Sequence, residues 1–349
     1  MTGIHAMPSS DSKVVDYCVI GGGACGSYLA SLLNNQGHSL VLVEKSRGLG
    51  GRLATRRITV DGALMQPELG ALCYSPPWRS ELSYKWLQSG IIEAWGDDIW
   101  VLAGKNTQAL RDLTQSIECQ TQVRAIALNF PDKLGHWVIQ CQANDQTQDT
   151  HKNIHAHNIV LAIPAPQAAE LLTTGENIGQ IDTNLIAQQK MLSRWTFVLA
   201  ARGQVAGRPY CFPAGKLANG AIESIFQTSI KPGCQPVTDS QGNNLNAWHI
   251  SASLAWSEKN IDCSKIDVEA ELKPQIIDAI KSEFGATSIE HCESFQSHLW
   301  RYAHADSRLT PGYIKNARND LWVAGDWLCG QNLDSAFYSA ELLAQKIMG

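Results

Sequence analysis

The chain has 349 residues, of which 44% are hydrophobic and 17% charged, so it is long enough for two domains or one large interleaved domain. Its formal net charge of −5 argues against a general nucleic-acid partner, because neutralising phosphates requires an excess of Lys and Arg. Ten irregularly spaced cysteines, none in a C-x-x-C pair, favour free thiols over disulfides or a zinc site. No stretch has the apolar length of a membrane span, and residues 1–13 lack the apolar core of a secretion signal. We therefore expect a loose N-terminal tail, no membrane partner and a cytoplasmic location.

A strand, a glycine-rich turn and a helix open the chain. Residues 14–20 form a short β-rich run, and G-x-G-x-x-G follows at Gly21, Gly23 and Gly26. The first glycine allows a tight turn, the second lets the backbone approach a pyrophosphate, and the third allows close packing of helix on strand. The helix, expected over residues 24–36, would point free N–H groups at the phosphates.

A second strand is predicted over residues 39–43, and Glu44 ends it. A carboxylate there can accept both ribose hydroxyls of an adenosine and would repel a 2′-phosphate. These features leave NAD and FAD open. A second glycine pair at Gly50 and Gly51, followed by Arg52, favours FAD, because an ordinary NAD domain has no reason for it. Arg52 can pair with a pyrophosphate.

From this point the sequence resembles the flavin amine oxidase superfamily. The segment QPELGALCYS, residues 66–75, resembles that superfamily's next segment, although Glu68 replaces its usual Asp. By this resemblance the backbone around Leu72 and Cys73 would pass beside the isoalloxazine ring.

Three later segments complete the expected cofactor domain. TQVRAIAL (121–128) and HWVIQCQ (136–142) are predicted as a hairpin, and the resemblance places Val123 next to the adenine. HNIVLAIPAPQAAELL (157–172) is predicted as a buried strand, a Pro turn and a helix, and its Ala162 matches the chain crossing near the cofactor. The last segment, residues 321–348, is predicted as a strand, a Gly-Asp turn and a terminal helix that aims its N-terminus at the flavin.

The resemblance implies FAD bound non-covalently, because residues 300–302 read Trp-Arg-Tyr where covalent amine oxidases carry a flavin-linked Cys. The residues expected to hold FAD are Gly21, Gly23, Ala24, Cys25, Gly26, Glu44, Lys45, Gly51, Arg52, Leu72, Cys73, Val123, Ala162, Gly325, Asp326, Leu333, Asp334 and Ala336.

The expected fold class is α/β. It comprises a Rossmann-like FAD-binding domain of the two-domain amine oxidase and para-hydroxybenzoate hydroxylase type, and an interleaved α+β substrate domain. We assign residues 14–75, 114–165 and 290–349 to the first domain, and 76–113 and 166–289 to the second. In the second domain we expect strands at 194–202, 221–230 and 247–257, and helical residues 267–285 broken at Pro274. Trp78, Trp86, Trp95 and Trp100 are expected to form the core of a lid.

The segments SHLWRYAHA (297–305), AGDWLCG (324–330) and LDSAFYSAELLA (333–344) resemble bacterial renalase-like proteins. This resemblance implies an FAD-dependent oxidase that converts the 2- and 6-dihydro isomers of NAD(P)H to NAD(P)+, with O2 reduced to H2O2. Trp300, Tyr302 and Trp327 would form aromatic walls for the flat ring, and Arg301 would contact a substrate carboxamide or phosphate.

Three alternatives stay open. A flavin-dependent amine oxidase commonly uses a lysine-held water, and the sequence does not place such a lysine. An NAD(P)H-driven hydroxylase or reductase is a second alternative, and a second dinucleotide domain for it is not found. A non-catalytic flavoprotein is the third. We expect no metal site: His151, His155 and His157 are interpreted as a polar connection before a strand. His298 and His304 are candidates to line the site.

Overall fold

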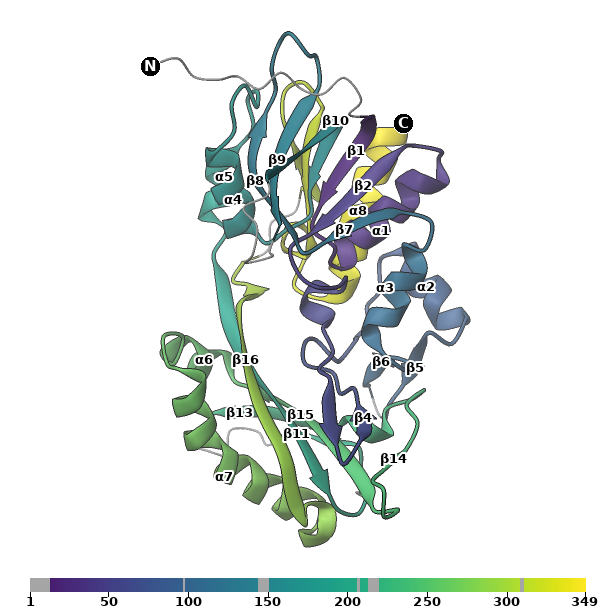
Figure 1. Cartoon of the computed structure of the whole chain (residues 1–349), viewed down its shortest axis with the longest axis vertical. Coiled ribbons are helices and arrows are strands. Elements are labelled where there is room, and N and C mark those ends of the chain that lie inside the picture. Colours follow the sequence, from purple (N-terminus) through teal and green to yellow (C-terminus); the bar gives the residue numbers. More distant parts are fainter. Residues whose placement is uncertain (1–12, 97, 144–150, 206–207, 213–219, 308–310) are drawn as a thin grey trace.

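The computed structural model describes residues 13–96, 98–143, 151–205, 208–212, 220–307 and 311–349. The N-terminal tail, predicted over residues 1–13, lies outside these residues except for Lys13. Two large β-sheets occupy opposite ends of an elongated molecule, and the C-terminus lies at the upper sheet (Figure 1). In the described residues no helix is long and apolar enough to cross a membrane.

The upper sheet is eight-stranded and mostly parallel, in the order β17-β18-β10-β1-β2-β7, with β8 and β9 attached to β10. β1 pairs in parallel with both β2 and β10, so the start of the chain lies at the centre of the sheet. The strands are β1 (Val14–Ile20), β2 (Leu40–Glu44), β7 (Glu118–Thr121), β8 (Val123–Asn129), β9 (Trp137–Ala143), β10 (His151–Leu161), β17 (Tyr313–Lys315) and β18 (Leu321–Ala324).

Two helices far apart in sequence cover one face of the upper sheet. These are α1 (Ala24–Asn35) and α8 (Leu333–Met348), and they share a core cluster with Tyr17 and Val19 of β1. On the other face the β8–β9 hairpin and α4 (Ala165–Thr173) pack against Ile20, and α5 (Thr183–Gln188) lies beside α4. Burial of both faces explains the nearly continuous apolar pattern of β1 and β2.

The lower sheet has six strands and is antiparallel, in the order β12-β13-β15-β11-β16, with β14 attached to β15. The long helix α7 (Lys265–Phe284) packs on one face through Leu272 and Ile276, and the short helix α6 (Leu254–Lys259) contacts β11. The strands are β11 (Met191–Arg202), β12 (Tyr210–Cys211), β13 (Ile222–Gln227), β14 (Val237–Thr238), β15 (Asn244–Ala252) and β16 (His291–Ala305).

Segments from the first third of the chain fill the region beside the lower sheet. The hairpin of β3 (Ile58–Val60) and β4 (Ala63–Met65) packs its apolar residues on β11 and β15. A second hairpin, β5 (Ile92–Ala94) and β6 (Trp100–Leu102), lies beside α2 (Glu81–Gln88) and α3 (Asn106–Leu113), as Figure 1 shows. Single-turn helices are η1 (Gly51–Leu53), η3 (Thr228–Ile230), η4 (Ala286–Ser288) and η5 (Asp326–Leu328).

This arrangement confirms the predicted α/β fold with a Rossmann-like domain and a second, interleaved part. The divisions along the chain differ from the expected ones in four places. The hairpin of β3 and β4, which was assigned to the first domain, packs on the lower sheet, and α4 and α5, which were assigned to the second domain, pack in the upper part. Strand β16, which was assigned to the cofactor domain, pairs with β11 along most of its length in the lower sheet. The helices α2 and α3 join the core of the upper part, where Trp86 packs edge-on against Phe337 of α8.

Two local predictions were wrong. The helix α7 continues through Pro274, because the packing of its buried face on the lower sheet outweighs the cost of proline in a helix interior, about 3 kcal/mol. The three histidines at 151, 155 and 157 lie within β10 rather than in a connection, because the strand extends back to pair with β9.

The four tryptophans at 78, 86, 95 and 100 all pack against other aromatic rings.

Candidate functional site

One cavity of about 1340 Å³ lies between the two sheets. Its upper wall is formed by the glycine-rich turn after β1, the end of β2 and the start of α8, and its lower wall by β11, β13, β15 and β16. Ligand pockets usually measure about 300–1,000 Å³. This cavity is therefore large enough for a dinucleotide and a second molecule beside it.

The glycine-rich turn presents bare backbone to the cavity. A Cβ at Gly26 would lie 1.9 Å from the backbone oxygen of Gly21, so the third glycine serves close packing of α1 on β1. A Cβ at Gly23 would meet nothing within 4 Å, and no side chain caps the N-terminus of α1. The first N–H groups of α1 therefore face open space, which suits an anionic phosphate.

Glu44 fixes the shape of this turn. The backbone N–H of Gly22 donates to Glu44 Oε2 (2.8 Å), and the N–H of Ser46 donates to Oε1 (2.7 Å). The carboxylate is 6% exposed and lines the cavity. Each oxygen keeps a lone pair for a further donor, so Glu44 can hold the turn and still accept a ribose hydroxyl.

Arg52 and Asp326 join separate segments of the chain that line the cavity. Arg52 donates to both carboxylate oxygens of Asp326, at 2.9 and 2.5 Å, and to the backbone oxygen of Ala303 (3.0 Å). Gly70 must be glycine beside this pair, because a Cβ there would lie 1.9 Å from the backbone oxygen of Arg52. The second glycine-rich segment, the turn after β18 and the end of β16 are thus tied together.

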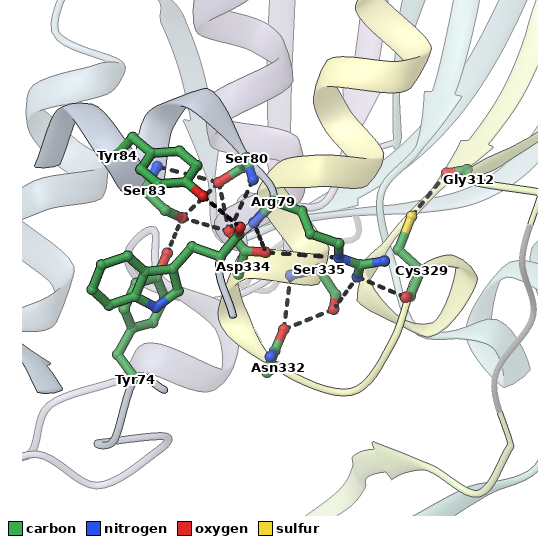
Figure 2. Close-up of polar contacts among 11 residues, drawn as sticks. Tyr74, Arg79, Ser80, Ser83, Tyr84, Gly312, Cys329, Asn332, Asp334 and Ser335 are labelled. Atoms are coloured by element: carbon green, nitrogen blue, oxygen red, sulfur yellow. Dashed lines mark hydrogen bonds and ion pairs between the residues drawn. The ribbon is translucent and has the colours of Figure 1, made fainter. Parts of the chain in front are cut away.

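Asp334 holds the N-terminus of α8 in place on the side that faces away from the cavity. Figure 2 shows its carboxylate accepting from Ser80 and Ser83 and from the backbone of Arg79. Asp334 is 1% exposed and does not line the cavity, whereas its neighbour Leu333 does. The prediction that Asp334 contacts the cofactor is therefore corrected: it positions the end of the helix that faces the cavity.

The lower wall carries an aromatic ring held by a hydroxyl. Trp300 Nε1 donates to Thr196 Oγ1 (3.0 Å), and Thr196 in turn donates to the backbone oxygen of Leu69 (2.9 Å). The His298 ring lies edge-on to Trp300, with centroids 4.3 Å apart. Because each group is fixed by the next, the wall offers a pre-formed surface for a flat ring.

Three histidines line the cavity and are neutral at neutral pH. Burial lowers the pKa of His249 to about 4, and the cations Arg194 and Lys231 lower it further. Burial also lowers the pKa of His298 and of His304 to about 4. The site therefore holds imidazoles that accept or donate hydrogen bonds without carrying charge.

Cys25 and Cys329 have raised pKa values. Burial raises the pKa of Cys25, which lies in the first turn of α1. Burial likewise raises the pKa of Cys329 to about 11. These thiols stay protonated at neutral pH.

The structure brings most of the predicted site residues together. Those that line the cavity are Gly21, Gly23, Ala24, Cys25, Glu44, Lys45, Gly51, Arg52, Leu72, Cys73, Val123, Ala162, Trp300, Arg301, Tyr302, Gly325, Asp326, Leu333 and Ala336. Their roles toward a ligand stay predictions. Besides Gly26 and Asp334, Trp327 lies outside the lining. It is fully buried in the upper core, and its Nε1 donates to Ile163 O (3.3 Å), so the prediction that it forms an aromatic wall is corrected.

Sequence reasoning missed the polar residues that the lower sheet contributes. Arg194 and Thr196 on β11 and His249 and Ser251 on β15 line the cavity. In each pair the residues are two apart, the spacing that places side chains on one face of a strand. This alternation was visible in RWTFV and WHISA, but polar residues at period two normally indicate a solvent-exposed face.

A family model of an NAD(P)-binding Rossmann-like domain matches residues 19–88. Solved structures with low sequence identity share the fold along nearly the whole chain. A candidate protoporphyrinogen oxidase from Exiguobacterium sp. 255-15 is 10% identical, with a TM-score of 0.62 and coverage of 97% of this chain and 99% of that one.

The solved structures of two amine-oxidising enzymes also share the fold along nearly the whole chain at low sequence identity. A putrescine oxidase bound to putrescine is 11% identical, with a TM-score of 0.61 and coverage of 97% and 100%. The cyclohexylamine oxidase from Brevibacterium oxydans IH-35A is 11% identical, with a TM-score of 0.59 and the same coverage. The chain has the fold of these oxidases. Its first domain is of the dinucleotide-binding Rossmann type.

Proposed function

We propose that the protein is an FAD-dependent oxidase of dihydronicotinamide nucleotides. The fit of FAD is supported by the uncapped N-terminus of α1, the bare backbone at Gly23 and the carboxylate of Glu44. Gly51 packs directly on the turn, since a Cβ there would lie 3.2 Å from Gly23 Cα. This is the contact expected when a second glycine-rich segment passes close to a dinucleotide.

The observation that carries the choice of substrate is the composition of the lower wall. It combines the aromatic rings of Trp300 and Tyr302 with the cations Arg301 and Lys265. Among the described residues, neither cation forms an ion pair. Rings can stack on a flat dihydropyridine, and cations suit the phosphates of a nucleotide.

The overall reaction joins a dihydronicotinamide, O2 and a proton to give the nicotinamide cation and H2O2. Bound FAD supplies the hydride acceptor. The protein's part is to place the ring, since donating a hydride from a dihydropyridine requires no base. The neutral His298 and His304 agree with this, because they neither repel the developing cation nor carry a proton to be lost.

Cofactor binding is tested by purification. The protein should be yellow and should release its flavin on acid treatment; colourless protein that takes up no FAD, or a flavin that stays attached, would contradict the proposal. Glu44→Ala should weaken FAD retention, because a hydrogen bond to a charged group contributes about 1.5–3 kcal/mol. Glu44→Gln, which keeps one acceptor oxygen, should lose less.

The substrate is tested by anaerobic stopped-flow measurement of flavin bleaching. The 2- and 6-dihydro isomers of NAD(P)H should bleach it quickly and 1,4-NADH slowly, because a rigid pocket sets only one ring carbon at reacting distance. The shared fold with oxidases of putrescine and cyclohexylamine makes simple amines the comparison substrates. Bleaching by amines alone would favour an amine oxidase, and bleaching by neither would favour a non-catalytic flavoprotein.

A further inference from the structure

His249 is held between a carbonyl oxygen and a hydroxyl. Its Nδ1 lies 3.1 Å from the backbone oxygen of Glu68, and its Nε2 lies 3.1 Å from Ser251 Oγ. A carbonyl oxygen can only accept, so Nδ1 must carry the proton. Because burial keeps this imidazole neutral at neutral pH, Nε2 carries none. The tautomer of His249 is therefore set by the backbone of Glu68.

Hydrogen bonds to Glu68 and to the following residue in turn fix that backbone. Glu68 Oε1 accepts from Lys231 Nζ (2.7 Å) and from the backbone N–H of Asn106 (3.0 Å). The next residue, Leu69, offers its oxygen to Thr196 Oγ1 (2.9 Å). The peptide unit that selects the tautomer of His249 thus has little freedom to turn, so the tautomer is stable.

The tautomer of His249 determines the direction in which the Ser251 hydroxyl donates its proton. A serine hydroxyl has one proton, and His249 Nε2 can only accept it, so Ser251 must donate along this bond. Ser251 is 8% exposed and lines the cavity. Its oxygen therefore faces the substrate space with lone pairs and without a proton, which makes it an acceptor only.

We propose that Ser251 selects substrates whose ring carries a hydrogen-bond donor, and thereby distinguishes a carboxamide from a carboxylate. A nicotinamide offers N–H groups to the Ser251 oxygen, whereas a nicotinate offers only lone pairs. A buried site built to pair with a donor strongly rejects an analogue that lacks it. His249 is the positioning residue, because it sets the direction of the hydroxyl. This inference rests on the proposed nicotinamide nucleotide substrate.

The test measures binding without turnover, by isothermal titration calorimetry of the FAD-loaded protein. The probes are NAD+ and its nicotinic acid counterpart, which differ only in that the ring carries a neutral carboxamide in the first and a carboxylate in the second. We expect NAD+ to bind about three- to tenfold more tightly, since one hydrogen bond of ordinary strength corresponds to a factor of up to about ten. Equal binding would overturn the role of Ser251 and leave the proposed function standing. Binding of neither probe would overturn both.

Variants separate this role from a structural one. Ser251→Ala should weaken the binding of NAD+ about three- to tenfold without weakening the binding of its nicotinic acid counterpart. Ser251→Thr keeps the hydroxyl and should therefore keep the preference for NAD+. His249→Asn keeps a donor for Glu68 but frees the Ser251 proton to face the cavity. The binding preference of this variant should shift toward the nicotinic acid counterpart, whereas a general loss of packing around His249 would weaken the binding of both probes. An unchanged ratio in His249→Asn would contradict the proposal.

Ser229→Ala is the matched control. Ser229 lies just after β13, outside the cavity lining, and donates to Asn246 Oδ1 (3.3 Å). Its loss removes one serine hydrogen bond from the same sheet region and should leave the ratio of the two dissociation constants as in the wild type. A changed ratio in this control would show that the preference does not report on Ser251.

Discussion

Arg52 and Asp326 are 274 residues apart in sequence, yet their side chains form an ion pair with two hydrogen bonds in the cavity lining. The same guanidinium also binds the backbone of Ala303 on the long strand β16. One arginine therefore joins the upper part of the molecule to the lower sheet. Asp326 is 5% exposed, so without Arg52 its carboxylate would be nearly buried and without its ion-pair partner.

Replacing Arg52 should weaken both cofactor retention and stability. Arg52→Ala leaves a nearly buried carboxylate without its partner, which costs about 1–3 kcal/mol. Arg52→Lys keeps the charge but loses the planar fork of N–H donors. Its FAD content and its stability should therefore lie between those of Arg52→Ala and those of the wild type. FAD content after gel filtration and urea unfolding of the FAD-loaded protein measure the two effects. Equal values for the lysine and alanine variants would contradict a role for the fork.

The two tryptophans at 300 and 327 should behave in opposite ways. Trp327→Ala removes a fully buried ring and should lower the free energy of unfolding by about 3–5 kcal/mol, and Trp327→Phe should lower it less. Trp300→Phe keeps a ring but loses the bond to Thr196, so it should slow flavin reduction with little change in stability. Unfolding curves and stopped-flow traces on the same preparations check both. A catalytic defect in stable Trp327→Phe would restore its predicted place in the site.

Stability should fall as the pH is lowered from 7 to 5. The folded protein holds the pKa of His249 at about 4, below its usual value, while the unfolded chain takes up the proton near pH 6.5. The stability that this neutral imidazole contributes is present above pH 6.5 and is lost as the pH falls toward 4. The slope is at most about 1.4 kcal/mol per pH unit for one such group.

Burial lowers this pKa most; the hydrogen bond to the backbone of Glu68 raises it, and the positive charges of Arg194 and Lys231 lower it further. Urea unfolding at several pH values should show a smaller slope in His249→Asn than in the wild type. The same slope in both proteins would mean that His249 does not titrate in this window. The remaining slope in the variant should come mainly from His298 and His304, whose pKa values are lowered in the same way.

The upper wall of the cavity was predictable because its signals are local. The G-x-G-x-x-G at residues 21–26, the acid at the end of the next strand and the second glycine pair each specify backbone close to a ligand. The bounds of β1 and the start of α8 at Leu333 agree with the sequence prediction. The prediction that Trp327 lines the site was wrong, because the sequence does not show whether an aromatic residue next to a cofactor-binding turn faces the ligand or the core.

The lower wall was not predictable, because its residues become neighbours only through strand pairing. His249 and Thr196 lie on β15 and β11, which pair side by side, and β16 completes the wall from another 40 residues along the chain. No short motif records such pairings. The buried ion pair of Glu68 and Lys231 is a contact of the same kind: 163 residues separate its members.

Glu68 and Lys231 form an ion pair with side-chain exposures of 3% and 0%. Lys231 Nζ lies 2.7 Å from Glu68 Oε1 and 2.9 Å from Asn106 Oδ1, and this links the end of η3 to the segment before Leu72. The other oxygen, Glu68 Oε2, has no hydrogen-bond partner among the described residues. Removing either charge alone therefore leaves the other buried and uncompensated.

Lys231→Met should destabilise the protein by about 3–5 kcal/mol, because the carboxylate of Glu68 would stay buried without its cation. Combining it with Glu68→Gln should recover most of the loss, since replacing both members of a buried pair by neutral groups is often close to neutral. Urea unfolding of the wild type, the two single variants and the double variant forms a complete thermodynamic cycle. Additive losses in the double variant would show that the two residues stabilise the fold independently.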